Sequence, residues 1–148
     1  MRAIVQRVNH AQLTVEGEPV AKIGIGLVVL AGIYQDDTDR DRVYIAEKTA
    51  NLRIFQDEAG KMNLSVLDVR GEVLLVPNFT VAGSTRKGRR PSFDRAMAPD
   101  RSRAEFDRLA ADLAAQGVPV KTGVFGAHMH VLLENDGPVT LVIDSREA

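Results

Sequence analysis

The 148-residue sequence has no cysteine and no long apolar run. Without cysteine the chain offers no disulfide, no thiol nucleophile and no thiolate ligand for a metal ion. The longest apolar stretch, residues 23–33, includes three glycines and is too short to span a membrane. No signal-peptide apolar region follows Arg2, so we expect a cytoplasmic protein with no membrane partner.

A large excess of charge of one sign is also missing, since the formal net charge is −1. This balance does not indicate overall attraction to nucleic acid, and we expect no DNA partner, although a local basic patch can still contact phosphates. The hydrophobic content of 45% excludes a disordered chain. The length suits one ordinary domain, and no linker-like stretch divides residues 1–148.

Short β-strands account for most of the predicted structure. Period-two alternation or continuous aliphatic runs predict strands at residues 3–8, 11–15, 20–23, 27–30, 73–76, 118–121, 127–133 and 139–143. The runs at 27–30 and 73–76 are aliphatic throughout, which is typical of strands buried on both faces.

Two helices are predicted between these strands. Thr38 and Asp41 have the spacing of a capping box, and apolar residues at helical spacing follow them. Ser102 and Glu105 have the same spacing ahead of a second apolar stripe, which Gly117 can end. The pattern predicts a strand-rich α+β single domain with two main helices on one sheet or barrel.

The chain lacks the patterns of a protein nucleophile and of a metal site. No serine lies in a G-x-S-x-G elbow, and no signal pairs a histidine with a serine and a carboxylate. His128 and His130 share one face of a predicted strand, but a metal site needs three or four ligands and no third is indicated. We therefore expect neither a hydrolytic triad nor a metal ion or other cofactor.

Three further segments each allow a functional and a structural interpretation. A basic loop is formed by Arg86, Lys87, Arg89 and Arg90. This basic loop is either a solvated surface loop or a contact for phosphate groups. Pro77 ends a buried strand and leaves the following N–H groups free, either as oxyanion donors or satisfied locally with Phe79 in the core. Gly137-Pro138 is either a plain turn or a cis peptide that fixes nearby carbonyl groups in an unusual direction.

Motifs along essentially the whole chain resemble, in the same order, those of the D-aminoacyl-tRNA deacylase family, formerly described as D-tyrosyl-tRNA deacylases. The motifs are Gln6-Arg7-Val8, GKMNLSV at residues 60–66, Phe79-Thr80, Arg90-Pro91-Ser92-Phe93, Pro99-Asp100-Arg101, Thr122-Gly123, Met129 and NDGPVT at residues 135–140. No single motif is specific, but this many in one order identify the chain as a member of the family.

The resemblance implies a homodimer of barrel-like α+β subunits that removes D-amino acids, and glycine, from the 3′-terminal adenosine of tRNA. It implies that Gly137-Pro138 is a cis unit that reaches into the active site of the partner subunit. There its carbonyl groups would hold the amino group of the substrate and leave no room for an L side chain. The chemistry would be assisted by the ribose 2′-OH, with main-chain amides near Phe79 and Thr80 positioning the ester.

The resemblance also implies roles for single residues. Phe79 packs against the terminal adenine and Met129 lines the adenine pocket. Thr80 positions the substrate rather than attacking it. Arg7 fixes the Gly-Pro loop or the RNA end, and Asn135 belongs to the motif of that loop. The basic loop is then expected to meet phosphates of the acceptor stem.

One position departs from the family pattern. The family usually has Ser-Gln before Phe-Thr, whereas this chain has Pro77-Asn78, which lacks a backbone donor and a hydroxyl and has a shorter amide side chain beside the expected site. A sister branch in animals has Pro-Gln there, with relaxed chiral selectivity. The alternatives are therefore a relaxed deacylase that also acts on L-alanyl-tRNA, a non-catalytic module that binds the tRNA end, and an RNA-independent esterase. The retained Phe79 and Arg7 favour the D-selective enzyme.

Overall fold

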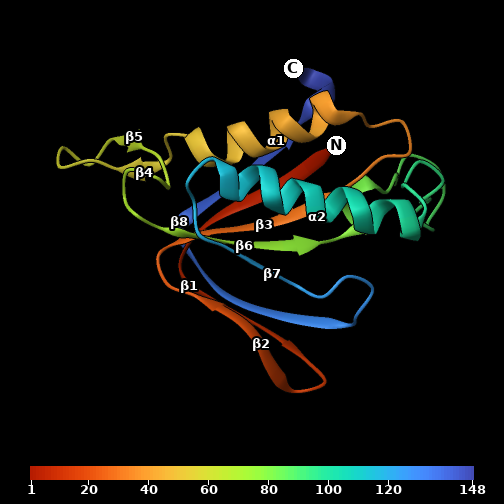
Figure 1. Ribbon diagram of the computed structural model, residues 1–148, viewed down its shortest axis with the longest axis horizontal. Helices are drawn as coiled ribbons and strands as arrows, with labels where there is room; N and C mark the ends of the chain where they lie inside the picture. The colour runs from red at the N-terminus through yellow and green to blue at the C-terminus, as the bar shows by residue number, and fades with distance from the viewer.

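A computed structural model, which describes residues 1–148, consists of one curled sheet with two helices on one side (Figure 1). The sheet contains β1 (Arg2–Val15), β2 (Glu18–Ile23), β3 (Gly26–Gly32), β6 (Glu72–Pro77), β7 (Val120–Thr122) and β8 (Met129–Asp144). Its strand order is β2-β1-β3-β6-β7, and β8 pairs with β1. A separate small hairpin, β4 (Phe55–Gln56) and β5 (Met62–Leu64), projects from one end.

The sheet is mixed and nearly closes on itself. β1 is antiparallel to β2, β3 and β8, whereas β3, β6 and β7 run parallel. The two ends of the strand order approach each other, because Lys121 Nζ in β7 donates a hydrogen bond to the Lys22 carbonyl in β2 (2.6 Å). The predicted strand-rich, barrel-like α+β class is confirmed.

The two helices, α1 (Asp39–Asn51) and α2 (Pro99–Ala115), cover one face of the sheet (Figure 1). Apolar side chains from both helices pack with alternate residues of β1, β3 and β6 in the larger core cluster, for example Ile45, Leu109, Val5, Val29 and Leu75. Arg42 links the helices through Glu105 (2.9 Å) and Asp112 (2.7 Å). None of the helices has the length and apolar character needed to cross a lipid bilayer.

The helix ends show which local signals were reliable. The capping box of α1 is present, because the Thr38 N–H donates to Asp41 Oδ2 (2.8 Å). The predicted start of α2 is wrong: Ser102 lies inside the helix and its N–H donates to the Ala98 carbonyl (2.9 Å). Pro99 occupies the first turn, where its missing N–H costs nothing and its fixed φ suits a helix.

Two pairs of predicted strands are continuous in the structure. Residues 3–8 and 11–15 both belong to β1, and residues 127–133 and 139–143 fall largely within β8. The β1–β8 register shifts between Gln6 and Val8 and again between Val8 and His10, so bulges replace the expected breaks. The Gly137-Pro138 bond is cis and lies within β8 rather than in a turn between two strands.

A smaller core cluster lies on the other face of the sheet, away from the helices. It contains Val8, Leu13, Val28, Leu74 and Val76, which alternate along their strands with residues of the larger cluster. Half-buried apolar side chains from β3 and β8 border this cluster, namely Leu30, Met129, Val131 and Leu133. These bordering side chains form the wall of the site described next.

Candidate active site

An apolar cavity of about 600 Å³ brings together four of the predicted site residues. Its walls come from β3, β6 and β8 and include Leu30, Val76, Val131 and Leu133. Asn78, Phe79, Thr80 and Met129 line the same cavity. Two segments that are distant in sequence, residues 78–80 and the start of β8, therefore meet at one site.

The end of β6 positions these residues. Pro77 pairs with Ala31 at the last register position of the parallel β3–β6 ladder, and the Asn78 N–H donates to the Ala31 carbonyl (2.9 Å). The chain then turns into a short 3₁₀ helix, η1 (Phe79–Ala82). The first N–H groups of such a helix have no partner within it. Pro77 thus ends the strand as predicted.

Phe79 is a surface residue rather than a core residue. Its side chain is 60% exposed, which rules out the alternative that placed it in the core. The Phe79 ring packs edge-to-face on Phe93, with the ring centroids 5.0 Å apart at 70°. An exposed aromatic ring that is held in this way can stack on a nucleic-acid base.

The Thr80 hydroxyl is engaged by its neighbour. Thr80 Oγ1 donates to Asn78 Oδ1 (2.5 Å), and a neutral amide oxygen does not accept a proton as a general base does. His128 lines the same cavity but makes no hydrogen bond to Thr80; its ring instead packs edge-to-face on His130 (5.1 Å). No group of three metal-ligating side chains forms anywhere in the chain. The geometry gives Thr80 an ordered position without activating it as a nucleophile.

A second cavity, the phenylalanine pocket, adjoins the first and has a volume of about 410 Å³. Four of the chain's five phenylalanines line it, namely Phe79, Phe93, Phe106 and Phe125. Pro77, Asn78, Phe79 and Gly126 line both cavities. Met129, expected in an adenine pocket, lines the apolar cavity instead. Sequence analysis assigned no role to Phe93 or Phe125, although the concentration of a rare residue type between positions 79 and 125 was an available signal.

The Gly137-Pro138 loop is a bulge in the β1–β8 ladder. Asn135 pairs with Val8 and Thr140 pairs with Gln6, so the four residues between them face only Arg7. Gly137 has a φ of +122°, and both Gly137 and Pro138 are exposed. Neither residue lines the apolar cavity or the phenylalanine pocket of the same chain.

Arg7 and Asn135 hold this bulge from inside. The Arg7 side chain is buried, and its Nε lies 3.3 Å from the Asp136 carbonyl and 3.1 Å from the Asp136 carboxylate. Its Nη1 donates to the Ile54 carbonyl (2.6 Å). Asn135 Oδ1 accepts from the Val139 N–H (2.9 Å). Of the two roles considered for Arg7, contact with the Gly-Pro loop is the one that the structure contains.

The basic loop lies at the surface beyond η1. Ser84 and Ser92 exchange two backbone hydrogen bonds at its base (2.8 and 2.9 Å). Arg86, Lys87, Arg89 and Arg90 are all exposed. None of the four forms an ion pair within the chain, since they are absent from every contact between a basic and an acidic side chain. Their charges are therefore available to an external anion.

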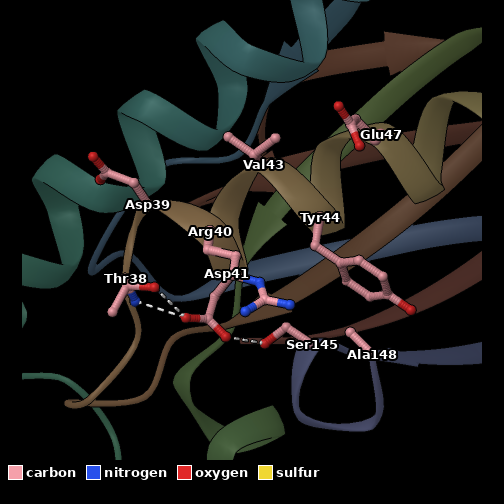
Figure 2. A pocket seen from close by; sticks show the side chains of 9 residues that line it. All are labelled: Thr38, Asp39, Arg40, Asp41, Val43, Tyr44, Glu47, Ser145 and Ala148. Carbon is pink, nitrogen blue, oxygen red and sulfur yellow. Dashed lines mark hydrogen bonds between the residues drawn. The ribbon is translucent and has the colours of Figure 1, made fainter.

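A larger hollow of about 710 Å³ lies beside the first turn of α1 and the short helix η2 (Ser145–Glu147), and it contains none of the predicted site residues (Figure 2). Ser145 Oγ donates to Asp41 Oδ1 (2.6 Å), and Thr38 donates to the other carboxylate oxygen (Figure 2). Partial burial raises the pKa of Asp41, but these hydrogen bonds outweigh it and lower the pKa to about 2. This hollow is a capped helix end with a structural carboxylate.

Comparison with known proteins gives concordant matches over nearly the whole chain. Residues 4–144 match the family model described as D-Tyr-tRNA(Tyr) deacylase. A relative from Thermoanaerobacter pseudethanolicus named D-aminoacyl-tRNA deacylase is 54% identical over 99% of each chain. One of the same name from Thermus aquaticus is 55% identical over 99% of this chain and 97% of its own. A solved structure described as c-Myc DNA Unwinding Element Binding Protein has a TM-score of 0.92 at 38% identity, covering 97% of this chain and 98% of that one.

Proposed function

Because the chain belongs to the D-Tyr-tRNA(Tyr) deacylase family, we propose that it hydrolyses the ester between a D-amino acid, or glycine, and the 3′-terminal adenosine of tRNA. The observation that carries this proposal is the 54% identity over 99% of the chain with a relative named D-aminoacyl-tRNA deacylase. Sequence identity at this level over a whole domain supports the same reaction class, and the grouping of Asn78, Phe79, Thr80 and Met129 in one cavity agrees with it.

The two adjoining cavities suit the two halves of this substrate. The phenylalanine pocket offers flat apolar surfaces to the terminal adenine, with the exposed Phe79 ring at its edge. The apolar cavity then accepts the aminoacyl group. The ester that joins the two halves would lie beside Asn78 and Phe79, which line both cavities.

The chemistry requires positioning more than activation. A water molecule attacks the ester carbonyl, the bond to the ribose oxygen breaks, and the proton of the water passes to that oxygen with help from the neighbouring hydroxyl of the ribose. Main-chain N–H groups near Phe79 and Thr80 would stabilise the negative charge on the carbonyl oxygen. Thr80 then orders Asn78 and the turn rather than attacking the ester, as its hydrogen bond to Asn78 suggests.

Chiral selection is assigned to the Gly137-Pro138 loop of a second copy of the chain. The loop is exposed and lies outside both cavities of its own chain, so a homodimer is needed to bring it to the aminoacyl group. Its carbonyl groups would accept from the α-amino group of the substrate, and its main chain would occupy the space that an L side chain requires. Arg7 and Asn135 hold the loop in the geometry for this contact.

Pro77-Asn78 favours one alternative, a deacylase that also accepts L-alanyl-tRNA. Asn78 Oδ1 already accepts from Thr80, so this oxygen is engaged within the chain and less available to the ribose. Weaker placement of the ribose would relax the angle at which the α-carbon meets the loop. A non-catalytic module that binds the tRNA end is the other alternative.

The test is deacylation of matched D-tyrosyl-, L-tyrosyl-, glycyl- and L-alanyl-tRNA by the purified protein. Loss of the D-tyrosyl and glycyl esters, with both L esters intact, is the expected result. Loss of L-alanyl-tRNA as well would establish the relaxed activity, and no acceleration on any ester would leave a binding module. Replacing the ribose 2′-OH of the terminal adenosine by hydrogen should slow the reaction if RNA assists it.

Mixing two variants tests whether the loop acts across a dimer. A subunit with Gly137→Ala keeps its cavities, and one with Phe79→Ala keeps its loop. A mixed dimer of the two contains one complete site only if the loop acts in the partner, so activity regained on mixing supports this arrangement. No regain, with mixed dimers demonstrated, would contradict it.

A further inference from the structure

A third cavity, of about 230 Å³, lies at the opposite end of η1 from Phe79 and is rich in basic and hydroxyl groups. We call it the arginine cavity. The side chains that line it are Arg2, Tyr34, Ser84, Thr85, Arg86 and Arg95. No aspartate or glutamate lines it. Its chemistry therefore favours an anion.

Two of the three guanidinium groups in this cavity have no anionic partner. Arg2 is paired with Asp144 (2.7 Å). Arg86 and Arg95 are absent from all ion pairs, and Arg95 makes only a contact of its Cζ with the Tyr34 ring, 5.5 Å from the centroid. Planar guanidinium groups with free N–H donors match the oxygens of a phosphate group.

The cavity is built on an ordered frame. The Tyr34 ring is 4% exposed, and Tyr34 and Ala96 form a β-bridge. The Gln35 N–H donates to the Arg95 carbonyl (3.0 Å), which fixes the main chain of Arg95. Burial raises the pKa of Tyr34, so the phenol keeps its proton and remains a hydrogen-bond donor.

The arginine cavity adjoins the proposed active site through two shared segments. Phe79 of η1 lines the phenylalanine pocket, whereas Ala82 of the same helix lines the arginine cavity. Phe93 and Arg95 divide in the same way between the two cavities. At about 2 Å of rise per residue in a 3₁₀ helix, the two ends of η1 are ~6 Å apart.

We propose that the arginine cavity binds a backbone phosphate of the tRNA 3′ strand, next to the terminal adenosine. With the adenine in the phenylalanine pocket, the strand leaves past η1, and the adjacent phosphate meets Arg86 and Arg95. The inference rests on the proposed deacylase function and adds to it a subsite for the RNA backbone. This subsite would favour tRNA over smaller aminoacyl esters, because a lone adenosine has no such phosphate.

The experiment compares D-tyrosyl-tRNA with D-tyrosyl-adenosine, which lacks the phosphate, in the wild type and in Arg95→Gln and Arg86→Gln. The measured quantity is the ratio of kcat/KM for tRNA to kcat/KM for the adenosine ester. We expect each substitution to lower this ratio about tenfold, and to reduce the slope of log kcat/KM against log salt for tRNA by about 0.7. Lys48→Gln is the charge-matched control, since Lys48 lies on α1 and contacts the Tyr44 ring.

Three results would overturn the inference. A proportional loss on both substrates would mean that the arginines support the fold or the ester site. An unchanged ratio would mean that no tRNA phosphate binds there, even if inorganic phosphate binds the wild type and marks the cavity as a free-anion site. A ratio lowered equally by Lys48→Gln would point to overall charge. Failure of the proposed function is distinct from all three, because the wild type would then hydrolyse neither ester.

Discussion

Replacement of Arg7 by methionine tests whether the Gly-Pro loop is held from inside its own chain. Methionine keeps much of the length of the buried side chain but removes all its donors. The substitution loses the short bond to the Ile54 carbonyl (2.6 Å) and the longer one to the Asp136 carbonyl (3.3 Å). It also removes the ion pair with the Asp136 carboxylate (3.1 Å).

The expected cost follows from these contacts. A hydrogen bond from a charged donor contributes about 1.5–3 kcal/mol, and only the bond to Ile54 is short enough to count in full. The weaker bond and a half-exposed ion pair add roughly 1–2 kcal/mol. We therefore expect the free energy of unfolding to fall by about 3–5 kcal/mol, which corresponds to a Tm lower by roughly 10 °C or more.

Urea denaturation followed by circular dichroism measures the stability, and deacylation is then assayed at a temperature where the variant is folded. Under those conditions the D-tyrosyl to L-tyrosyl preference should fall at least tenfold, because the loop is no longer fixed. Arg53→Met is the matched control, since Arg53 is exposed and makes one bond, to the Asn63 carbonyl (2.8 Å); it should cost less than about 1 kcal/mol. A folded Arg7→Met variant with wild-type chiral preference would refute the role assigned to Arg7.

Three other substitutions have defined outcomes. Thr80→Val should lower kcat by no more than about tenfold, as loss of one neutral hydrogen bond implies, whereas complete loss in kinetic assays would indicate a nucleophile. Gly137→Ala places a Cβ 2.9 Å from Val139 Cγ2 at a φ of +122°, so urea denaturation should show a loss of about 1–3 kcal/mol, against a smaller loss for Gly88→Ala, where nothing lies within 4 Å. The folded pKa of Asp41, about 2, lies below its ordinary value of 3.8, so its contribution to stability is present above pH 4 and lost as the pH falls through 2. The Tm difference between wild type and Asp41→Asn should therefore shrink between pH 5 and pH 2, and a constant difference would contradict this.

Local signals predicted those parts of the fold in which neighbouring residues decide the conformation. The capping box of Thr38 and Asp41 is one, because both partners lie within one helical turn. The continuity of β8 could not be predicted in this way. Its residues 135–138 are typical turn formers, and only the long partner strand β1 keeps the chain extended on both sides of them. At the start of α2, Ser102 looked like a cap, but Pro99 begins the helix three residues earlier.

The candidate site was predicted from family motifs for its central residues and missed at its edges. Phe79, Thr80 and Met129 do share a cavity. Phe125 reaches the phenylalanine pocket only because α2 and the segment after β7 fold back over the end of β6, which no short window of sequence shows. The arginine cavity is a similar case, since Arg2 and Arg95 are brought together by tertiary packing.

The bulge between β1 and β8 also sets how many residues the Gly-Pro loop can have. Pairing resumes on both sides of it, at Asn135 with Val8 and at Thr140 with Gln6. One inserted or deleted residue would move one half of β8 by a position along β1 and turn its buried side chains, such as Ile143, toward solvent. The sheet therefore tolerates changes of residue type in the loop far better than changes of length, and the reach of the loop is set by the pairing of the strands around it.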